Sequence, residues 1–246
     1  MTIDRKILSY LACGLAVFLA GCGTTGKFVY PHSSQNLWHI PANPANNCKI
    51  AVLPFEDERG SKNQFATYFL GWLPLVPYGW ITYERPDAAK TFMSITEYNF
   101  TPTEDLAKAA AYSTLRSNIC KNAFFSFGND EADYYLKGIF SSTTYVGKSY
   151  TYCISLLSGY LHIFGLPAGS STNHIDLKLV LVGRDREKIV WQKDYSKEWA
   201  VVQGLYYNWG DDCLGFSILF QEIMNDALPR IQQAIAQDSL NSEKIE

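Results

Sequence analysis

The run Ile50–Phe55 (IAVLPF) constrains the fold more than any other part of the chain, because it contains no polar residue. A strand with one wet face alternates apolar and polar residues. A continuous apolar run is typical of a strand that is buried on both faces of a sheet. Pro54 and the charged EDER that follows indicate where this strand ends. We therefore expect a sheet that is covered on both sides along this strand.

Sequence patterns predict the order of the other elements. Thr101, Pro102 and Glu104 have the spacing of a helix N-terminus with a capping box. The later expected elements are the strand 123–127, the long strand 132–146, the hairpin 174–201 and the helix 216–237, with a further short strand at 91–98. We predict an α+β fold: a mixed β-sheet in the order strand-helix-strand-strand-hairpin-helix, with helices packed on the sheet and two apolar insertions. Residues 48–237 would form one domain, and 238–246 a polar tail.

The last predicted helix places six apolar side chains on one face: Phe216, Phe220, Ile223, Ala227, Ile231 and Ile235. Such spacing is typical of a helix that packs one side against a core. Pro229 lies within this helix and is expected to bend it.

The N-terminus has the layout of a secretory signal peptide. Arg5 and Lys6 precede the apolar core Ile7–Ala20. The sequence LAGC ending at Cys22 resembles the lipobox of bacterial lipoproteins. That resemblance implies removal of residues 1–21 and attachment of lipid, including palmitate-type chains, to Cys22. The alternative is a short N-terminal anchor helix.

The lipobox resemblance also implies a location. Gly23 stands where aspartate is the usual signal for retention in the inner membrane. We therefore expect a lipid anchor in the outer membrane on the periplasmic side, with the cell surface as the alternative. Residues 22–47 are rich in Pro, Asn and Ser, and are predicted to be a flexible tether.

Charge and motifs exclude several functions. Loss of residues 1–21 changes the net charge from −3 to −4, which argues against a nucleic-acid partner. His32, His39, His162 and His174 lack metal-ligand spacing, and no nucleophile or phosphate-binding motif occurs. We expect no metal, no cofactor and no enzymatic activity. The carboxylates at 56–58, 130–133 and 211–212 are predicted to be solvated charges in turns.

Four further cysteines fit an oxidising compartment: Cys48, Cys120, Cys153 and Cys213. Cys48 and Cys120 each stand just before one of two strands that a crossover helix joins. Parallel strands of this kind begin at the same edge of a sheet, so we predict a Cys48–Cys120 disulfide. Cys153 and Cys213 would be the remaining pair. Free thiols are the alternative.

Two long stretches carry no Asp, Glu, Lys or Arg, namely Tyr68–Tyr83 and Ser149–Ser171. Exposed apolar patches mark membrane or partner surfaces, and Trp and Tyr suit the headgroup zone of a bilayer. We predict such a patch from Phe69, Trp72, Leu75, Tyr78, Trp80, Leu156, Leu161 and Phe164. The alternative is that both stretches are lids over the core.

Three segments carry a family resemblance: KIAVLPFEDER, ADYYLKGIF and IDLKLVLVGRDREKIVWQKDY. They resemble a group of envelope lipoproteins that includes the curli-secretion lipoprotein and relatives of the N-terminal domain of the Tol translocation protein. This resemblance implies an accessory or assembly factor of an envelope complex, with a protein partner there. The first alternative is an oligomeric secretion-channel subunit, which would be a homo-oligomer, and the second is a periplasmic enzyme of unrecognised type. The curli channel is built from long amphipathic hairpins, whereas the stretch Tyr68–Tyr83 of this chain is interrupted by Pro74 and Pro77.

Overall fold

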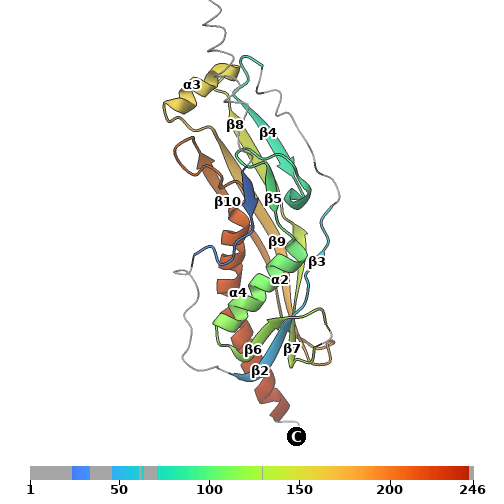
Figure 1. Ribbon diagram of the computed structural model, residues 1–246. Coiled ribbons are helices and arrows are strands. Elements are labelled where there is room, and N and C mark those ends of the chain that lie inside the picture. The colour runs from blue at the N-terminus through green and yellow to red at the C-terminus, as the bar shows by residue number, and fades with distance from the viewer. Residues whose placement is uncertain are drawn as a thin grey trace, which may run out of the picture.

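The structure is a computed structural model that describes residues 24–33, 46–60, 63, 71, 73–128 and 130–243. It has the predicted α+β architecture, with a large mixed sheet and a small parallel pair of strands (Figure 1). The strands are β1 (Thr25–Lys27), β2 (Asn46–Val52), β3 (Glu56–Asp57), β4 (Tyr78–Tyr83), β5 (Glu97–Asn99), β6 (Cys120–Phe125), β7 (Tyr134–Ser142), β8 (Tyr145–Tyr150), β9 (Gly169–Gly183) and β10 (Ile189–Gln203). The helices are α2 (Pro102–Arg116), α3 (Ser158–Ile163) and α4 (Gly215–Glu243).

The large sheet has the strand order β4-β8-β9-β7-β2-β6, with β10 also paired to β9 and β3 to β7. The β2 strand runs parallel to both of its neighbours, β6 and β7. The long β9 strand pairs antiparallel with β8 over its first part and with β7 over its second. The predicted crossover from β2 through α2 to a parallel β6 is confirmed, as is the β9–β10 hairpin.

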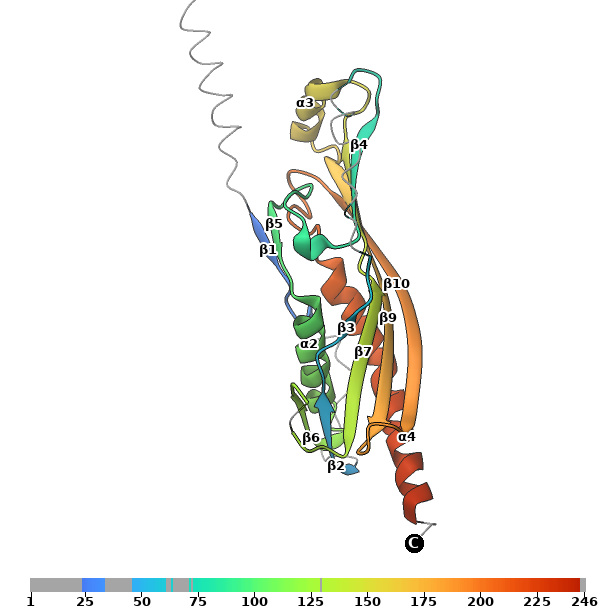
Figure 2. The same cartoon turned by 90° about the vertical axis from the view of Figure 1, so that its right-hand side faces the viewer.

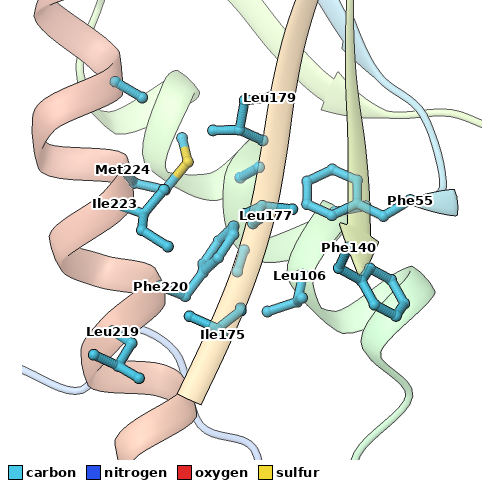
Figure 3. Packing of buried hydrophobic residues seen from close by; sticks show 14 of the residues in the cluster. Phe55, Leu106, Phe140, Ile175, Leu177, Leu179, Leu219, Phe220, Ile223 and Met224 are labelled. Carbon is cyan, nitrogen blue, oxygen red and sulfur yellow. The ribbon is translucent and has the colours of Figure 1, made fainter. Parts of the chain in front are cut away.

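Helices α2 and α4 pack on one face of the sheet and enclose the main core (Figure 2). The inward side chains of β9, Ile175, Leu177 and Leu179, alternate with outward polar ones as the two-residue period of a strand requires. They meet Phe220 and Ile223 of α4 (Figure 3). The β2 strand is buried on both faces as predicted, because Ala51 lies in a second, smaller cluster on the other side of the sheet.

The final helix keeps its predicted core face, and all six of its apolar residues are buried. Pro229 lies inside α4. The predicted boundary at residue 237 is wrong, since α4 continues to Glu243. Asp238 accepts a hydrogen bond from Tyr134 and pairs with Lys188, which ties the first residue of the expected tail to the domain.

Three other local predictions need correction. The expected strand 91–98 is reduced to β5, and the long strand 132–146 is interrupted at Thr143, whose buried hydroxyl accepts a hydrogen bond from Arg59 at 2.6 Å. The capping box is also absent. Asp105 Oδ2 instead accepts the Thr101 backbone N–H at 2.6 Å, while Glu104 pairs with Lys108.

The predicted flexible tether is wrong for residues 24–33, which are docked on the domain. Strand β1 pairs in parallel with β5, and Phe28 and Tyr30 pack against the main core. Gln221 of α4 accepts the backbone N–H of His32 at 3.0 Å. Aromatic burial explains the docking, since two large rings supply the apolar area that a polar Pro/Asn/Ser segment lacks. Residues 22–23 and 34–45 of the predicted tether lie outside the described part, and its last two residues, 46–47, already belong to β2.

Candidate functional site

Three loops meet at one end of the large sheet, opposite the C-terminal end of α4 (Figures 1 and 2). They are residues 73–77 before β4, residues 151–168 between β8 and β9, and residues 204–210 after β10. We call them together the apolar tip. Leu75 N–H donates to the Cys153 carbonyl at 3.0 Å, and the Tyr206 hydroxyl donates to the Ile163 carbonyl at 2.9 Å. The three loops therefore form one connected surface.

The apolar tip exposes large side chains to an unusual degree. Leu75 is 83% exposed, Phe164 81% and Leu156 76%. The other exposed large side chains of the tip are Leu73, Ile154, Leu157, Tyr160, Ile163, Leu166, Leu205, Tyr206, Tyr207 and Trp209. None of the three loops contains Asp, Glu, Lys or Arg. A single exposed leucine needs no explanation, but a contiguous uncharged group of this kind marks a contact surface.

Backbone hydrogen bonds fix the tip in this conformation. The Pro77 carbonyl accepts the N–H groups of Thr151 and Tyr152 at 2.9 and 3.1 Å, and the Thr151 hydroxyl donates to the Val76 carbonyl at 2.6 Å. Leu75 has φ of 72°, in the left-handed region that a leucine rarely enters. Cys153 has φ of 63°. These conformations hold apolar side chains outward on an ordered framework.

The structure brings most of the predicted patch together. Leu75, Leu156 and Phe164 are strongly exposed, Tyr78 is 38% exposed, and Trp80 and Leu161 are half-buried. Phe69 and Trp72 lie outside the described residues, so their prediction stays a prediction. The lid alternative holds for the strand part of the first stretch, because β4 alternates and turns Ile81 and Tyr83 into the core.

The sequence prediction missed the third loop of the tip. Leu205, Tyr206 and Trp209 lie in an uncharged run, Val201–Gly210, that begins in the last residues of β10 and continues into the loop after it. Absence of charge was the signal that identified the other two stretches, and it would have identified this one. Below the tip, Lys148 of β8 is exposed and its Nζ lies 5.6 Å from the centre of the Tyr78 ring.

One carboxylate prediction is wrong, because Asp212 is completely buried. Its Oδ2 accepts the N–H groups of Ser94 and Ile95 at 2.6 and 3.1 Å, and its Oδ1 accepts Gln203 Nε2 at 2.6 Å. The Tyr145 hydroxyl lies 3.3 Å from Oδ1. These donors replace the water that a solvated turn would supply. Asp212 therefore links the segment before β5 to the end of β10.

A second buried polar cluster surrounds Arg59, whose side chain is 1% exposed. The guanidinium contacts Asp57 at 2.9 Å and Asp87 at 2.5 Å. Hydrogen bonding from Arg59 lowers the pKa of the Asp57 carboxyl to about 2. The cluster is fully paired, which is what a structural ion pair requires.

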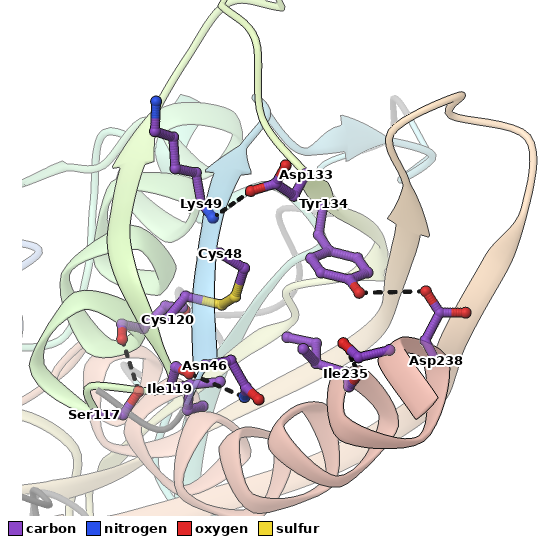
Figure 4. The surroundings of a disulfide bond; sticks show 12 residues. Asn46, Cys48, Lys49, Ser117, Ile119, Cys120, Asp133, Tyr134, Ile235 and Asp238 are labelled. Carbon is purple, nitrogen blue, oxygen red and sulfur yellow. Dashed lines mark hydrogen bonds between the residues drawn. A yellow bond between two sulfur atoms is a disulfide. The ribbon is translucent and has the colours of Figure 1, made fainter. Parts of the chain in front are cut away.

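Of the two predicted disulfides, one is present and the other is not (Figure 4). Cys48 and Cys120 form a disulfide with their Cα atoms 4.9 Å apart, at the neighbouring starts of parallel strands. The predicted Cys153–Cys213 pair is wrong, because both are free thiols. Cys153 is exposed in the apolar tip, whereas Cys213 is buried just before α4. Burial raises the pKa of the Cys213 thiol well above its usual range, which makes it unreactive.

In the described part of the chain, no three His, Cys, Asp or Glu side chains lie close enough to hold a metal ion. Its helices also include none that is long and apolar enough to cross a membrane. The lipobox with Cys22 falls in residues 1–23, outside the described part.

Comparison with models of protein families and with curated proteins gave no match. Among solved structures, a DUF330 protein of Xanthomonas campestris is similar, with 12% identity, 89% of this chain and 99% of that one covered, and a TM-score of 0.48. The PelC dodecamer of Paraburkholderia phytofirmans has 13% identity, coverage of 78% and 92%, and a TM-score of 0.38. Lipoprotein GNA1162 of Neisseria meningitidis has 16% identity, coverage of 72% and 98%, and a TM-score of 0.20. The function is therefore inferred from the residues of this chain.

Proposed function

We propose that this protein is a non-enzymatic lipoprotein of the outer membrane, anchored through Cys22, that serves as an accessory or assembly factor of an envelope complex. Its apolar tip would be the surface that contacts the membrane or a protein partner. The observation that carries the proposal is the tip itself, three uncharged loops held together with their large side chains outward.

Two further features support an envelope location. The Cys48–Cys120 disulfide belongs to an oxidising compartment, since cytosolic proteins rarely keep structural disulfides. The LAGC sequence at Cys22 supplies the site of lipid attachment. The two buried polar clusters, around Asp212 and Arg59, have their partners inside the fold and are assigned structural roles.

The anchor is tested by labelling cells with palmitate and separating their membranes. Wild-type protein should incorporate label and appear in the outer-membrane fraction, whereas Cys22→Ser should incorporate none and keep its signal peptide. Continued labelling of the Cys22→Ser protein would show that the anchor is wrongly assigned.

The contact surface is tested by placing a photo-crosslinking residue at Leu156 in intact cells. The matched control is Ser196, an exposed position on β10 outside the tip. Leu156 should give a defined protein or lipid adduct, and Ser196 should give none. Equal crosslinking from both positions would contradict a contact role for the tip. Native mass spectrometry that found a closed ring of many subunits would instead favour the secretion-channel alternative.

A further inference from the structure

We propose that the apolar tip inserts into the same bilayer that holds the lipid on Cys22, so that the domain stands on the membrane through two neighbouring contacts. This inference rests on the proposed lipidation of Cys22. It goes further because it names a lipid bilayer as the occupant of the tip and assigns the orientation of the domain.

The first argument is that the chain is clamped directly after the anchor. The Thr24 carbonyl accepts the Thr96 N–H at 2.9 Å, and the Thr24 hydroxyl donates to the Ser94 carbonyl at 2.8 Å. From Thr25 to Lys27 the chain then pairs with β5. Two residues span at most about 7 Å, so covalent geometry alone keeps Cys22 within that distance of Thr24. This short connection keeps the β1–β5 side of the domain close to its anchor.

The clamp is also connected to the tip. Ser94 Oγ accepts the N–H of Gly210, the last residue of the third tip loop, at 2.9 Å. The Ser94 N–H is in turn held by Asp212. Figures 1 and 2 show β1 and β5 beside the half of the molecule that ends in α3, far from the C-terminal end of α4. A lipid attached at Cys22 would therefore enter the bilayer on the side to which the tip points.

The chemistry of the tip favours lipid over protein. A protein interface usually surrounds its apolar centre with a polar and charged rim, whereas these three loops have no Asp, Glu, Lys or Arg. Tyr160, Tyr206 and Trp209 combine an apolar ring with one polar atom, which suits the headgroup zone. Lys148, exposed just below the tip, is placed to meet lipid phosphate. Because the acyl anchor raises the local concentration, a weak insertion energy is sufficient.

Gly159 offers a specific perturbation of this surface. A Cβ atom at Gly159 would meet nothing within 4 Å, and the residue is exposed in α3. Gly159→Glu therefore adds a charge to the tip without a steric clash, and a helical glycine is replaced by a better helix former. Gly159→Ala is the matched control, because it makes the same backbone change without the charge.

Cys153 supplies the measurement, as an exposed free thiol within the tip. Lipidated mature protein, which begins at Cys22, would be placed in vesicles of phosphatidylethanolamine and phosphatidylglycerol and treated with a membrane-impermeant maleimide. Insertion should make Cys153 react about tenfold more slowly in wild type and Gly159→Ala than in Gly159→Glu, a ratio that corresponds to about 1.4 kcal/mol. A Ser196→Cys substitution in each background should react at one common rate, because it reports a surface outside the tip.

The outcomes separate the two proposals. If wild-type protein purified from cells carries no palmitate and does not bind vesicles, the proposed anchor is overturned. Vesicle-bound lipidated protein whose Cys153 reacts as fast as the Ser196→Cys thiol would overturn tip insertion and leave the anchor intact. Shielding of Cys153 that disappears when the protein is diluted on the vesicles would assign the tip to a second copy of the chain, which also overturns the inference.

Discussion

Replacement of Asp212 by asparagine should destabilise the fold although it changes only one group. Every polar neighbour of the carboxylate is a donor: two N–H groups and a hydroxyl point to Oδ2, and Gln203 Nε2 and the Tyr145 hydroxyl point to Oδ1. An asparagine keeps the shape but turns one oxygen into an NH₂ group that faces donors. No orientation of the amide can restore both sets of hydrogen bonds.

The size of the effect follows from the bonds that are lost. The amide would place its NH₂ group on the Oδ1 side, where it faces only two donors and the Tyr145 hydroxyl can rotate to accept. The Gln203 bond is then broken, and the bonds at Oδ2 lose their charge. A hydrogen bond to a charged group contributes roughly 1.5–3 kcal/mol, so we expect a loss of about 2–4 kcal/mol. In a domain of this size that corresponds to a fall in the melting temperature of roughly 5–15 °C.

The assay is thermal unfolding followed by circular dichroism, with Asp211→Asn as control. Asp211 is the neighbouring carboxylate, half-buried and outside the network, so its substitution makes the same charge change and should shift the midpoint by less than about 2 °C. Hydrogen exchange should also accelerate at Ile95 and Thr96, where the clamp on Thr24 lies. If both variants unfold within about 2 °C of the wild type, the argument from unmatched donors fails.

Three further predictions concern other parts of the fold. Replacement of Cys48 and Cys120 by alanine should cost about 4 kcal/mol in the chain-entropy model, given their separation of 72 residues, and equal denaturant midpoints for the two proteins would contradict it. The pKa of Asp57 falls from 3.8 to about 2, so its contribution to stability should be complete above about pH 4 and should be lost between pH 4 and 2. In urea unfolding at several pH values, the free energy of unfolding should therefore fall less steeply with acid for Asp57→Asn than for the wild type. Leu75→Ser should change stability by less than about 0.5 kcal/mol, whereas Ile81→Ala, which is 1% exposed, should cost about 2–4 kcal/mol, and similar losses for both would place the tip in the core.

The parts of the fold that sequence could predict are those that a local pattern or a general topological rule determines. The unbroken apolar run of β2 required cover on both faces, and the helix that follows required a parallel partner. Together these two features placed Cys48 beside Cys120, although the residues are far apart in sequence. The buried face of α4 could be predicted in the same way, since six apolar residues repeat at helical spacing.

The features that sequence did not reveal depend on partners remote in the chain. Asp212 looks like a turn residue, and its burial depends on Ser94, a residue 118 positions away. Strand β1 has the sequence TGK, which carries no strand pattern, and it is a strand because β5 and two downstream aromatic residues fix it. The predicted Cys153–Cys213 pair rested on elimination, without a structural rule, and it is wrong.

The apolar tip is costly for the isolated domain, and that cost is itself an argument for contact. Left-handed backbone at a residue such as Leu75 costs on the order of 1–3 kcal/mol, and the exposed rings and aliphatic chains gain nothing from folding. In the same loops, backbone carbonyls accept hydrogen bonds from Thr151, Tyr152 and the Tyr206 hydroxyl. These bonds keep the apolar side chains outward, whereas a looser loop could fold them inward. Because the fold holds these apolar groups in water at a cost in free energy, it is consistent with burial of the groups against a second surface. Since the docked N-terminal strand begins next to this surface, a bilayer is the apolar phase that an acylated Cys22 would bring within reach.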